Sequence, residues 1–413
     1  MKKTLLLLIA LCTAFFCGCS NSQREVDDYA YVIAMGIDKG ENNNLKVTLS
    51  FANPNKIGSG KEGGAGEGGS ENLINFTTET SGIYNSLNVA NDNISKVVNL
   101  SHVKLIVFSK EIAKEGLQKY VDGFVRELHV RPVTILAVCD KDPDGYLRKI
   151  SPKLEVNPEK YINDLFEKQQ TTFISKTTLR DFYSWADSDG KDLALTYIGT
   201  LGEEKSDDYK EGEQSMSYNI DDNETSQTPK KTDNKSVILG SAFFKGDKMV
   251  GTGSNIENLY RLILTGKAKE VVYSIKDDEK SITELSITQR SKPTIKVDVS
   301  SKRPKATIDI TIEADIMSIE DRDVDTNEYI KIEQKLNADL EKNIKKYLHK
   351  TVKDLKVDPV GFGNKAKMNF LTFDKWKRYN WKEKYPSMEY QVNVKSEVIR
   401  FGLLNKSLQK SDK

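Results

Sequence analysis

The sequence predicts an α+β protein of several domains, with mixed β-sheets and packed helices, behind a cleaved lipoprotein signal peptide. Three observations support this prediction. Strand patterns, alternating or fully apolar, are interspersed with amphipathic helical patterns along the chain. A polar, charged stretch at 201–236 interrupts these patterns. A short apolar segment that ends in a cysteine precedes all of them.

Residues 1–18 have the organisation of an export signal. Two lysines precede the apolar run Leu5–Phe16, and the sixteen largely apolar residues Thr4–Cys19 fall short of a bilayer-spanning helix, which needs about 20. The small residue Gly18 directly before Cys19 resembles a bacterial lipobox, in which the cysteine thiol takes a diacylglyceryl group. Cleavage before Cys19 then leaves the lipidated cysteine as the new N-terminus.

Two residues of this junction depart from the lipobox pattern. Phe16 stands where a lipobox favours Leu, and Cys17 stands where it favours a small residue. Cys17 is the poorer acceptor, because bulky Phe16 would sit directly before the cut. A plain signal peptide or an uncleaved anchor is the alternative interpretation of the segment.

Residues 19–200 are predicted to form an N-terminal α/β domain. Its first two strands, Tyr29–Asp38 and Leu45–Phe51, flank a turn-forming spacer and are expected to pair as an antiparallel hairpin. Helical periodicity and apolar runs then alternate, which predicts a mixed sheet covered by helices. The expected helix, strand, helix and strand lie at 83–97, 103–108, 115–130 and 133–138.

Two stretches are predicted to lack regular structure. Ile57–Ser70 is Gly-rich and contains "GSGK", but Asn55 and Glu62 occupy positions where a phosphate-binding loop needs Gly and Ser or Thr. A flexible loop insertion is the better interpretation. The segment 201–236 is polar and poor in branched apolar residues, so it is expected to be a linker or disordered loop at a domain boundary.

The remainder is predicted to form a middle α+β domain at 237–290 and a C-terminal α+β domain at 291–413. Apolar residues at every fourth position mark a long helix at Tyr329–Val352. The other expected elements are a strand pair at 236–253, a helix and strand at 255–275, strands at 294–299 and 306–312, and a last strand at 390–402.

Composition and motifs give no indication of catalysis. Lys plus Arg number 62 and Asp plus Glu 61, so the chain as a whole lacks the positive charge that favours nucleic-acid binding. With the signal removed and Cys19 acylated, Cys139 is the remaining cysteine, and a buried core thiol is expected. His102, His129 and His349 share no metal-binding spacing. We therefore predict no catalytic residue, metal or cofactor.

The segment Phe373–Pro386 combines aromatic and basic residues, a pattern that also occurs where proteins stack on nucleic acids. Its spacing favours a core role instead. Phe370, Phe373, Trp376 and Tyr379 or Asn380 fall on one helical face, and Trp381 and Tyr385 are four apart. The rings are expected to be core anchors, with solvated lysines around them.

Taken together, the segments resemble the C-subunit lipoproteins of spore germination receptors of the Ger(x)C type. The resemblance lies in the order of several blocks rather than in any one of them. After the lipobox come "REVDDYAYVIAMGID", the block from "LSHVKLIVF" to "RPVTILAV", "YLRKISP", "GSAFFKGDKMVG" and the end block from "DPVGFGNKAK" to "VIRFG". The chain departs from the family after Cys19, where Ser20 and Asn21 replace the common Trp and Asp.

This resemblance implies three α+β domains and a non-enzymatic, lipid-anchored accessory subunit of a nutrient germinant receptor. It also implies a location on the outer face of the inner spore membrane, with a multidomain A subunit and a permease-like B subunit as partners. Cys19 is the one residue to which a role, lipidation, is assigned. Ligand-binding residues and the nutrient are not defined by the sequence.

Two other classes are considered. A solute-binding lipoprotein of an uptake system would have two similar lobes around a cleft, whereas the halves of this chain differ in pattern. An anchored hydrolase needs a nucleophile or metal constellation, and the sequence contains no recognisable motif for one. Adjacent genes for A-type and permease-like proteins would favour the receptor subunit, and an ATP-binding cassette would favour uptake.

Overall fold

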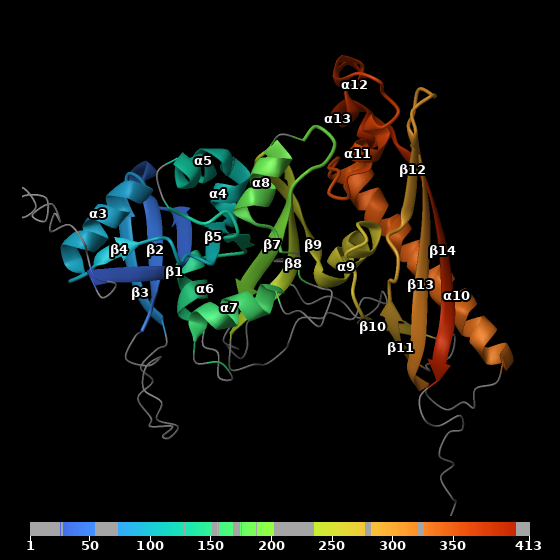
Figure 1. Cartoon of the computed structure of the whole chain (residues 1–413), viewed down its shortest axis with the longest axis horizontal. Helices are drawn as coiled ribbons and strands as arrows, with labels where there is room; N and C mark the ends of the chain where they lie inside the picture. The colour runs from blue at the N-terminus through green and yellow to red at the C-terminus, as the bar shows by residue number, and fades with distance from the viewer. Residues whose placement is uncertain are drawn as a thin grey trace, which may run out of the picture.

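The computed structural model of the chain describes residues 25, 28–53, 73–126, 129–150, 155, 157–167, 174, 176–186, 188–201, 235–276, 282–319 and 326–401. The predicted signal peptide, Cys19, the Gly-rich stretch at 57–70 and most of 201–236 lie outside these residues. Figure 1 shows two β-sheets side by side along the long axis, each with its own helices. The predicted α+β class with mixed sheets is confirmed.

The first sheet is built from nine strands in the described part of the chain. Their order is β3-β2-β1-β5-β6-β7-β8-β9, with β4 paired to β1. The neighbours β1, β5, β6 and β7 run parallel, and antiparallel strands flank them on both sides. The strands are β1 (Tyr29–Lys39), β2 (Leu45–Ala52), β3 (Leu73–Thr80), β4 (Val97–Asn99), β5 (Leu105–Ser109), β6 (Ile135–Cys139), β7 (Ala194–Thr200), β8 (Ser236–Lys245) and β9 (Lys248–Ser254).

Both faces of this sheet are covered, which explains why its central strands are continuous apolar runs. In β6, Leu136 and Val138 face one core, and Ile135, Ala137 and Cys139 face the other. Figure 1 shows α4 and α5 on the opposite side from α6 and α7. The helices are α3 (Ile83–Asn93), α4 (Lys110–Glu115), α5 (Gln118–Arg126), α6 (Pro143–Arg148), α7 (Pro158–Glu167) and α8 (Leu179–Ala186).

The second sheet has five strands in the described residues, centred on β13. One edge of β13 pairs with β12 and then β11, and β14 runs parallel along the other edge. Five α-helices of the described residues accompany this half. The elements are α9 (Asn255–Leu264), β10 (Val271–Lys276), β11 (Ile282–Thr288), β12 (Thr294–Asp298), β13 (Lys305–Ile319), α10 (Thr326–His349), α11 (Phe362–Lys367), α12 (Phe373–Tyr379), α13 (Trp381–Lys384) and β14 (Glu389–Phe401).

The predicted long helix is confirmed as α10, and its apolar stripe packs on the second sheet. Its polar side chains have a further role, because they accept hydrogen bonds from the outer N–H groups of the edge strand β14. Four residues of a helix rise about 6 Å, and two residues of a strand rise about 6.6 Å. Acceptor side chains at every fourth residue of α10 therefore lie opposite N–H groups at every second residue of β14. The bonds are Glu341 to the N–H of Val394 (3.0 Å), Asn337 to Ser396 (2.7 Å) and Glu333 to Val398 (2.8 Å). They cover an edge that would otherwise be open to pairing.

The predicted hairpin of the first two strands is confirmed by the antiparallel pairing of β1 and β2. The predicted helix at 83–97 extends too far, since α3 ends at Asn93 and Ile94 adopts an extended conformation. Val97 instead begins β4, whose Val98 N–H is held by the Asn91 side chain (2.8 Å). The predicted helix at 115–130 is interrupted near its start by Gly116 (φ +128°), so α4 and α5 are separate.

The first sheet continues across the segment expected to divide the domains. β8 follows 201–236 in sequence and pairs antiparallel with β7, which precedes it, with Tyr197 opposite Gly240. β9 then extends the same sheet. The strand pair expected at the start of the middle domain is therefore hydrogen-bonded into the sheet of the N-terminal half. The domain boundaries at 200, 236 and 290 stay predictions.

Candidate functional site

The lipidation residue predicted from the sequence, Cys19, lies outside the described residues. Cys139, predicted to be a buried core thiol, is 1% exposed at the end of β6. Burial raises the pKa of its thiol to about 12, so it is protonated at neutral pH and unsuited to act as a nucleophile. The core interpretation of Cys139 is confirmed.

The three histidines lie in different surroundings. The His102 ring packs at a tilt against the Tyr31 ring with centroids 4.6 Å apart, and Nδ1 of His349 lies 3.6 Å from Oδ2 of Asp354. His129 is exposed and follows α5. Within the described ranges, no three His, Cys, Asp or Glu side chains are arranged to hold a metal ion.

Asp358, in the segment "DPVGFG" between α10 and α11, is a densely hydrogen-bonded buried polar group of the described residues. Its side chain is 2% exposed and accepts four hydrogen bonds. The N–H groups of Gly361 (2.7 Å), Phe362 (3.0 Å) and Gly363 (2.8 Å) donate three, and the indole of Trp381 donates the fourth (3.1 Å). Gly361 adopts a left-handed conformation (φ +91°), which helps the backbone to turn its N–H groups toward one carboxylate.

Asp358 also joins the two halves of the chain. Its backbone N–H donates to the carboxylate of Asp192 (2.7 Å), and the N–H of Asp192 donates to the carbonyl of Asp358 (2.8 Å). Next to this pair, the N–H of Asn364 donates to the carbonyl of Gly190 (3.1 Å). A Cβ added to Gly363 would lie 2.5 Å from Trp381 and 2.7 Å from Gly190, so glycine is needed for this close approach. We call Gly190, Asp192, Asp358, Gly363 and Trp381 the junction.

Burial dominates the electrostatics of the junction. It raises the pKa of Asp358 to about 6, although the three backbone donors act in the opposite direction. Burial also raises the pKa of Asp192. The neighbouring Lys191 has a pKa lowered to about 8 by burial and by the charges of Arg261 and Lys267. Because these four hydrogen bonds to the Asp358 side chain all come from N–H groups, the carboxylate is the form that fits this site.

A second contact between the halves lies where β8 and β9 of the first sheet meet α9, which also packs on α10. Ser254 and Glu257 form a capping box at the start of this helix, and the Glu257 carboxylate also pairs with Lys350 after α10 (2.7 Å). Phe243 of β8 packs against Tyr347 of α10 with ring centroids 6.3 Å apart. Polar and apolar contacts together hold the two sheets in a fixed relation.

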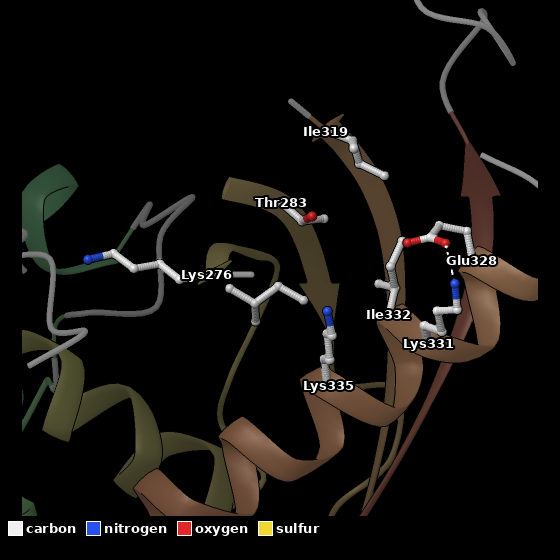
Figure 2. Close-up of a pocket in the computed structure, with 8 residues that line it drawn as sticks. Lys276, Thr283, Ile319, Glu328, Lys331, Ile332 and Lys335 are labelled. Atoms are coloured by element: carbon white, nitrogen blue, oxygen red, sulfur yellow. Dashed lines mark hydrogen bonds and ion pairs between the residues drawn. The ribbon is translucent and has the colours of Figure 1, made fainter. Parts of the chain in front are cut away.

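Two small cavities among the described residues are candidate ligand sites. Figure 2 shows the first, between the ends of β10, β11 and β13 and the start of α10, where Lys331 pairs with Glu328 (3.1 Å). It encloses about 10 Å³, the space of one water molecule. The second, about 20 Å³, borders the junction between Lys191 and Lys382. Small-molecule sites are far larger, roughly 300–1,000 Å³.

Phe373 was expected to be a core anchor together with Trp376 and Trp381, and this prediction is wrong. Trp376 and Trp381 are 2% and 3% exposed, but Phe373 is 50% exposed. The reason is that α12 begins at Phe373, with Thr372 as its N-cap, and Phe370 before the helix fills the inner position instead. The prediction also missed Asp358, whose sequence signal is the Gly-rich turn "DPVGFG", and Asp192, whose own surroundings in the sequence carry no such signal.

The fold and the junction define a two-part α+β protein in which a buried polar cluster joins the two halves. The model of the spore germination protein N-terminal domain matches residues 22–200, and that of the spore germination B3/GerAC-like C-terminal domain matches 239–402. The chain therefore belongs to the GerAC-like family of spore germination proteins, the C subunits of germination receptors. The resemblance seen in the sequence is confirmed.

Individual relatives have low sequence identity and matching length. Spore germination protein KC of Bacillus subtilis is 23% identical over 99% of this chain and 98% of its own. Spore germination protein GerQC of Bacillus cereus is 23% identical over 98% of this chain and 99% of its own. The crystal structure of the GerBC protein superposes with a TM-score of 0.54 at 14% identity, covering 88% of this chain and 96% of that one. This likeness shows the fold.

Proposed function

We propose that the chain is a lipid-anchored accessory subunit of a nutrient germinant receptor and that it acts by binding and assembly, without catalysis. Its partners are the receptor A subunit and a permease-like B subunit. The observation that carries the proposal is the match of both family models, in order, to 22–200 and 239–402. Names of relatives that denote spore germination proteins support the same process.

The proposed anchor is Cys19, which places the protein on the outer face of the inner spore membrane. Among the helices that the structure describes, none combines the length and apolar character of a spanning segment. Acyl chains such as palmitate contribute about 0.8 kcal/mol per buried CH₂, and two or more chains anchor a protein stably. Anchoring confines subunit and partners to one surface, which raises their effective concentration.

The junction fits an assembly role because its hydrogen bonds join the two halves of the described chain. Asp192 and Asp358 are separated by 166 residues and hold loops from the two halves in register. A subunit that transmits a signal by contact needs such fixed geometry, since partner surfaces on both halves must meet the complex together.

Nutrient germination of spores that lack this chain tests the proposal. We expect the response to the receptor's nutrient to be lost, restored by the wild-type gene in trans, and a non-nutrient trigger to work normally. The measurement is the fall in optical density as spores hydrate. Normal nutrient germination without the chain, in spores where no related subunit is present, would refute the accessory role.

A further inference from the structure

The strongest feature that the proposed function does not use is an apolar tip on the C-terminal half. Met368, Leu371 and Phe373 lie between the end of α11 and the start of α12, and they are 80%, 93% and 50% exposed. Leu371 and Met368 are the two most exposed large apolar side chains in the described residues. Figure 1 shows α12 projecting at the top of the C-terminal half.

The tip projects from an anchored base. Asn369 donates to the carbonyls of Val297 and Ala366, both at 3.0 Å, which ties the loop to β12 and α11. Phe370 turns inward against Trp376 and Tyr379, with ring centroids 5.6 and 5.0 Å away. Asn369 and Phe370 therefore fix the loop to the domain, and the exposed side chains of Met368, Leu371 and Phe373 are a consequence of the loop's fold.

Positive charge surrounds the tip. Residues 365–384 contain seven Lys or Arg and two Asp or Glu, a net charge of +5. The whole chain carries +1, so all other residues together carry −4. The ammonium groups of Lys367 and Lys377 each lie 5.0 Å from the centroid of the Phe373 ring. Within the part of the chain the structure covers, none of the seven cations forms an ion pair with a carboxylate.

We propose that this tip is a second membrane contact, in which Met368, Leu371 and Phe373 enter the interfacial layer of a bilayer and the surrounding lysines bind anionic lipid headgroups. Two forces draw a protein to that layer: burial of apolar side chains among the lipids and attraction of cations to anionic headgroups. Exposed apolar side chains surrounded by cations can use both. Each cation near an anionic surface adds about 1 kcal/mol, or roughly fivefold in partitioning. The contact goes beyond the proposed function and does not depend on acylation of Cys19.

Other occupants fit the tip less well. A stable protein interface buries roughly 800 Å² on each side, which three side chains cannot provide. Single-stranded nucleic acid needs open aromatic faces for stacking, yet the indoles of Trp376 and Trp381 are buried. An anionic lipid surface remains the partner that uses both the apolar side chains and the unpaired charges.

Photocrosslinking from the tip tests the proposal. Leu371 is replaced by p-benzoylphenylalanine in the full chain, which is mixed with vesicles of phosphatidylcholine alone or with phosphatidylglycerol. We expect lipid adducts, several-fold more with phosphatidylglycerol. The control carries the same residue at Met317, which is 63% exposed. Met317 is distant from the tip: the loop of the tip is tied to Val297, Val297 pairs with Ala306 of β13, and Met317 lies eleven residues further along that strand. It should yield few lipid adducts.

Charge reversal gives a matched second test. Lys367→Glu with Lys377→Glu should reduce the lipid adducts at position 371 at least fivefold. The control, Lys342→Glu with Lys395→Glu, makes the same change in net charge at two exposed lysines elsewhere and should leave them unchanged. No lipid adduct at 371, or a protein adduct there in native membranes, would overturn the proposal. Neither result bears on Cys19 or on nutrient germination, so failure of this contact is distinguishable from failure of the proposed function.

Discussion

Replacing Cys19 with alanine is expected to abolish lipid attachment completely. Without the thiol there is no acceptor for the diacylglyceryl group, and because lipoprotein cleavage follows that transfer, residues 1–18 should remain on the chain. Mass spectrometry of the N-terminal peptide measures both changes: the wild type should begin at an acylated Cys19, and Cys19→Ala should begin at the signal peptide.

The matched control for this experiment is Cys17→Ala. Cys17 lies two residues earlier in the same apolar segment and should leave with the signal peptide, so its replacement should leave the acylated N-terminus intact. An acyl group on Cys17, or a wild-type chain cut elsewhere without acylation, would contradict the assignment of Cys19. A plain signal peptide would give the second of these results.

Replacing Asp358 with alanine is expected to give the largest loss of folding stability, about 3–5 kcal/mol. The change leaves three backbone N–H groups and the Trp381 indole N–H buried without their acceptor, and each unsatisfied buried donor costs about 1–3 kcal/mol. Urea unfolding followed by tryptophan fluorescence suits this test, since Trp381 contacts Asp358 directly. The midpoint should fall well below that of the wild type.

Three further variants distinguish loss of the junction from a general effect of substitution on stability. Asp354→Ala removes an exposed carboxylate four residues earlier and should change stability by less than about 0.5 kcal/mol. Gly363→Ala adds a Cβ that meets Trp381 and Gly190, so it should destabilise the chain, whereas Gly123→Ala in α5 meets no atom within 4 Å and should not. If Asp358→Ala behaved like Asp354→Ala, the junction would have no structural role.

Patterns within single segments predicted much of the fold. The four-residue step of α10, the alternation of β2 and the apolar run of β6 each fix a local structure, because burial on one or both faces selects for one periodicity. The helices α6 and α8, of six and eight residues, were not predicted because the periodic signal is too brief, and α7, of ten residues, was also missed. After α3 ends, the Asn91 side chain accepts a hydrogen bond from the N–H of Val98 in β4, a contact that periodicity does not reveal.

Contacts between distant segments could not be predicted in the same way. Nothing in the local sequence of Asp192 indicates that its partner lies 166 residues later, and the apolar spacing of Phe373 gave no sign that α12 begins at that residue. The Glu333, Asn337 and Glu341 acceptors look like ordinary solvated helix positions until β14 is placed beside them. Such residues take their role from topology, and one sequence alone does not supply it.

Isolation of the wild-type chain from spore membranes in mild detergent, with crosslinks mapped by mass spectrometry, tests the assembly claim most directly. We predict that an A subunit and a permease-like B subunit co-purify with it in constant proportion, with crosslinks to surfaces on both halves of this chain. Recovery of the chain without either subunit, under conditions where the A and B subunits remain associated with each other, would contradict it.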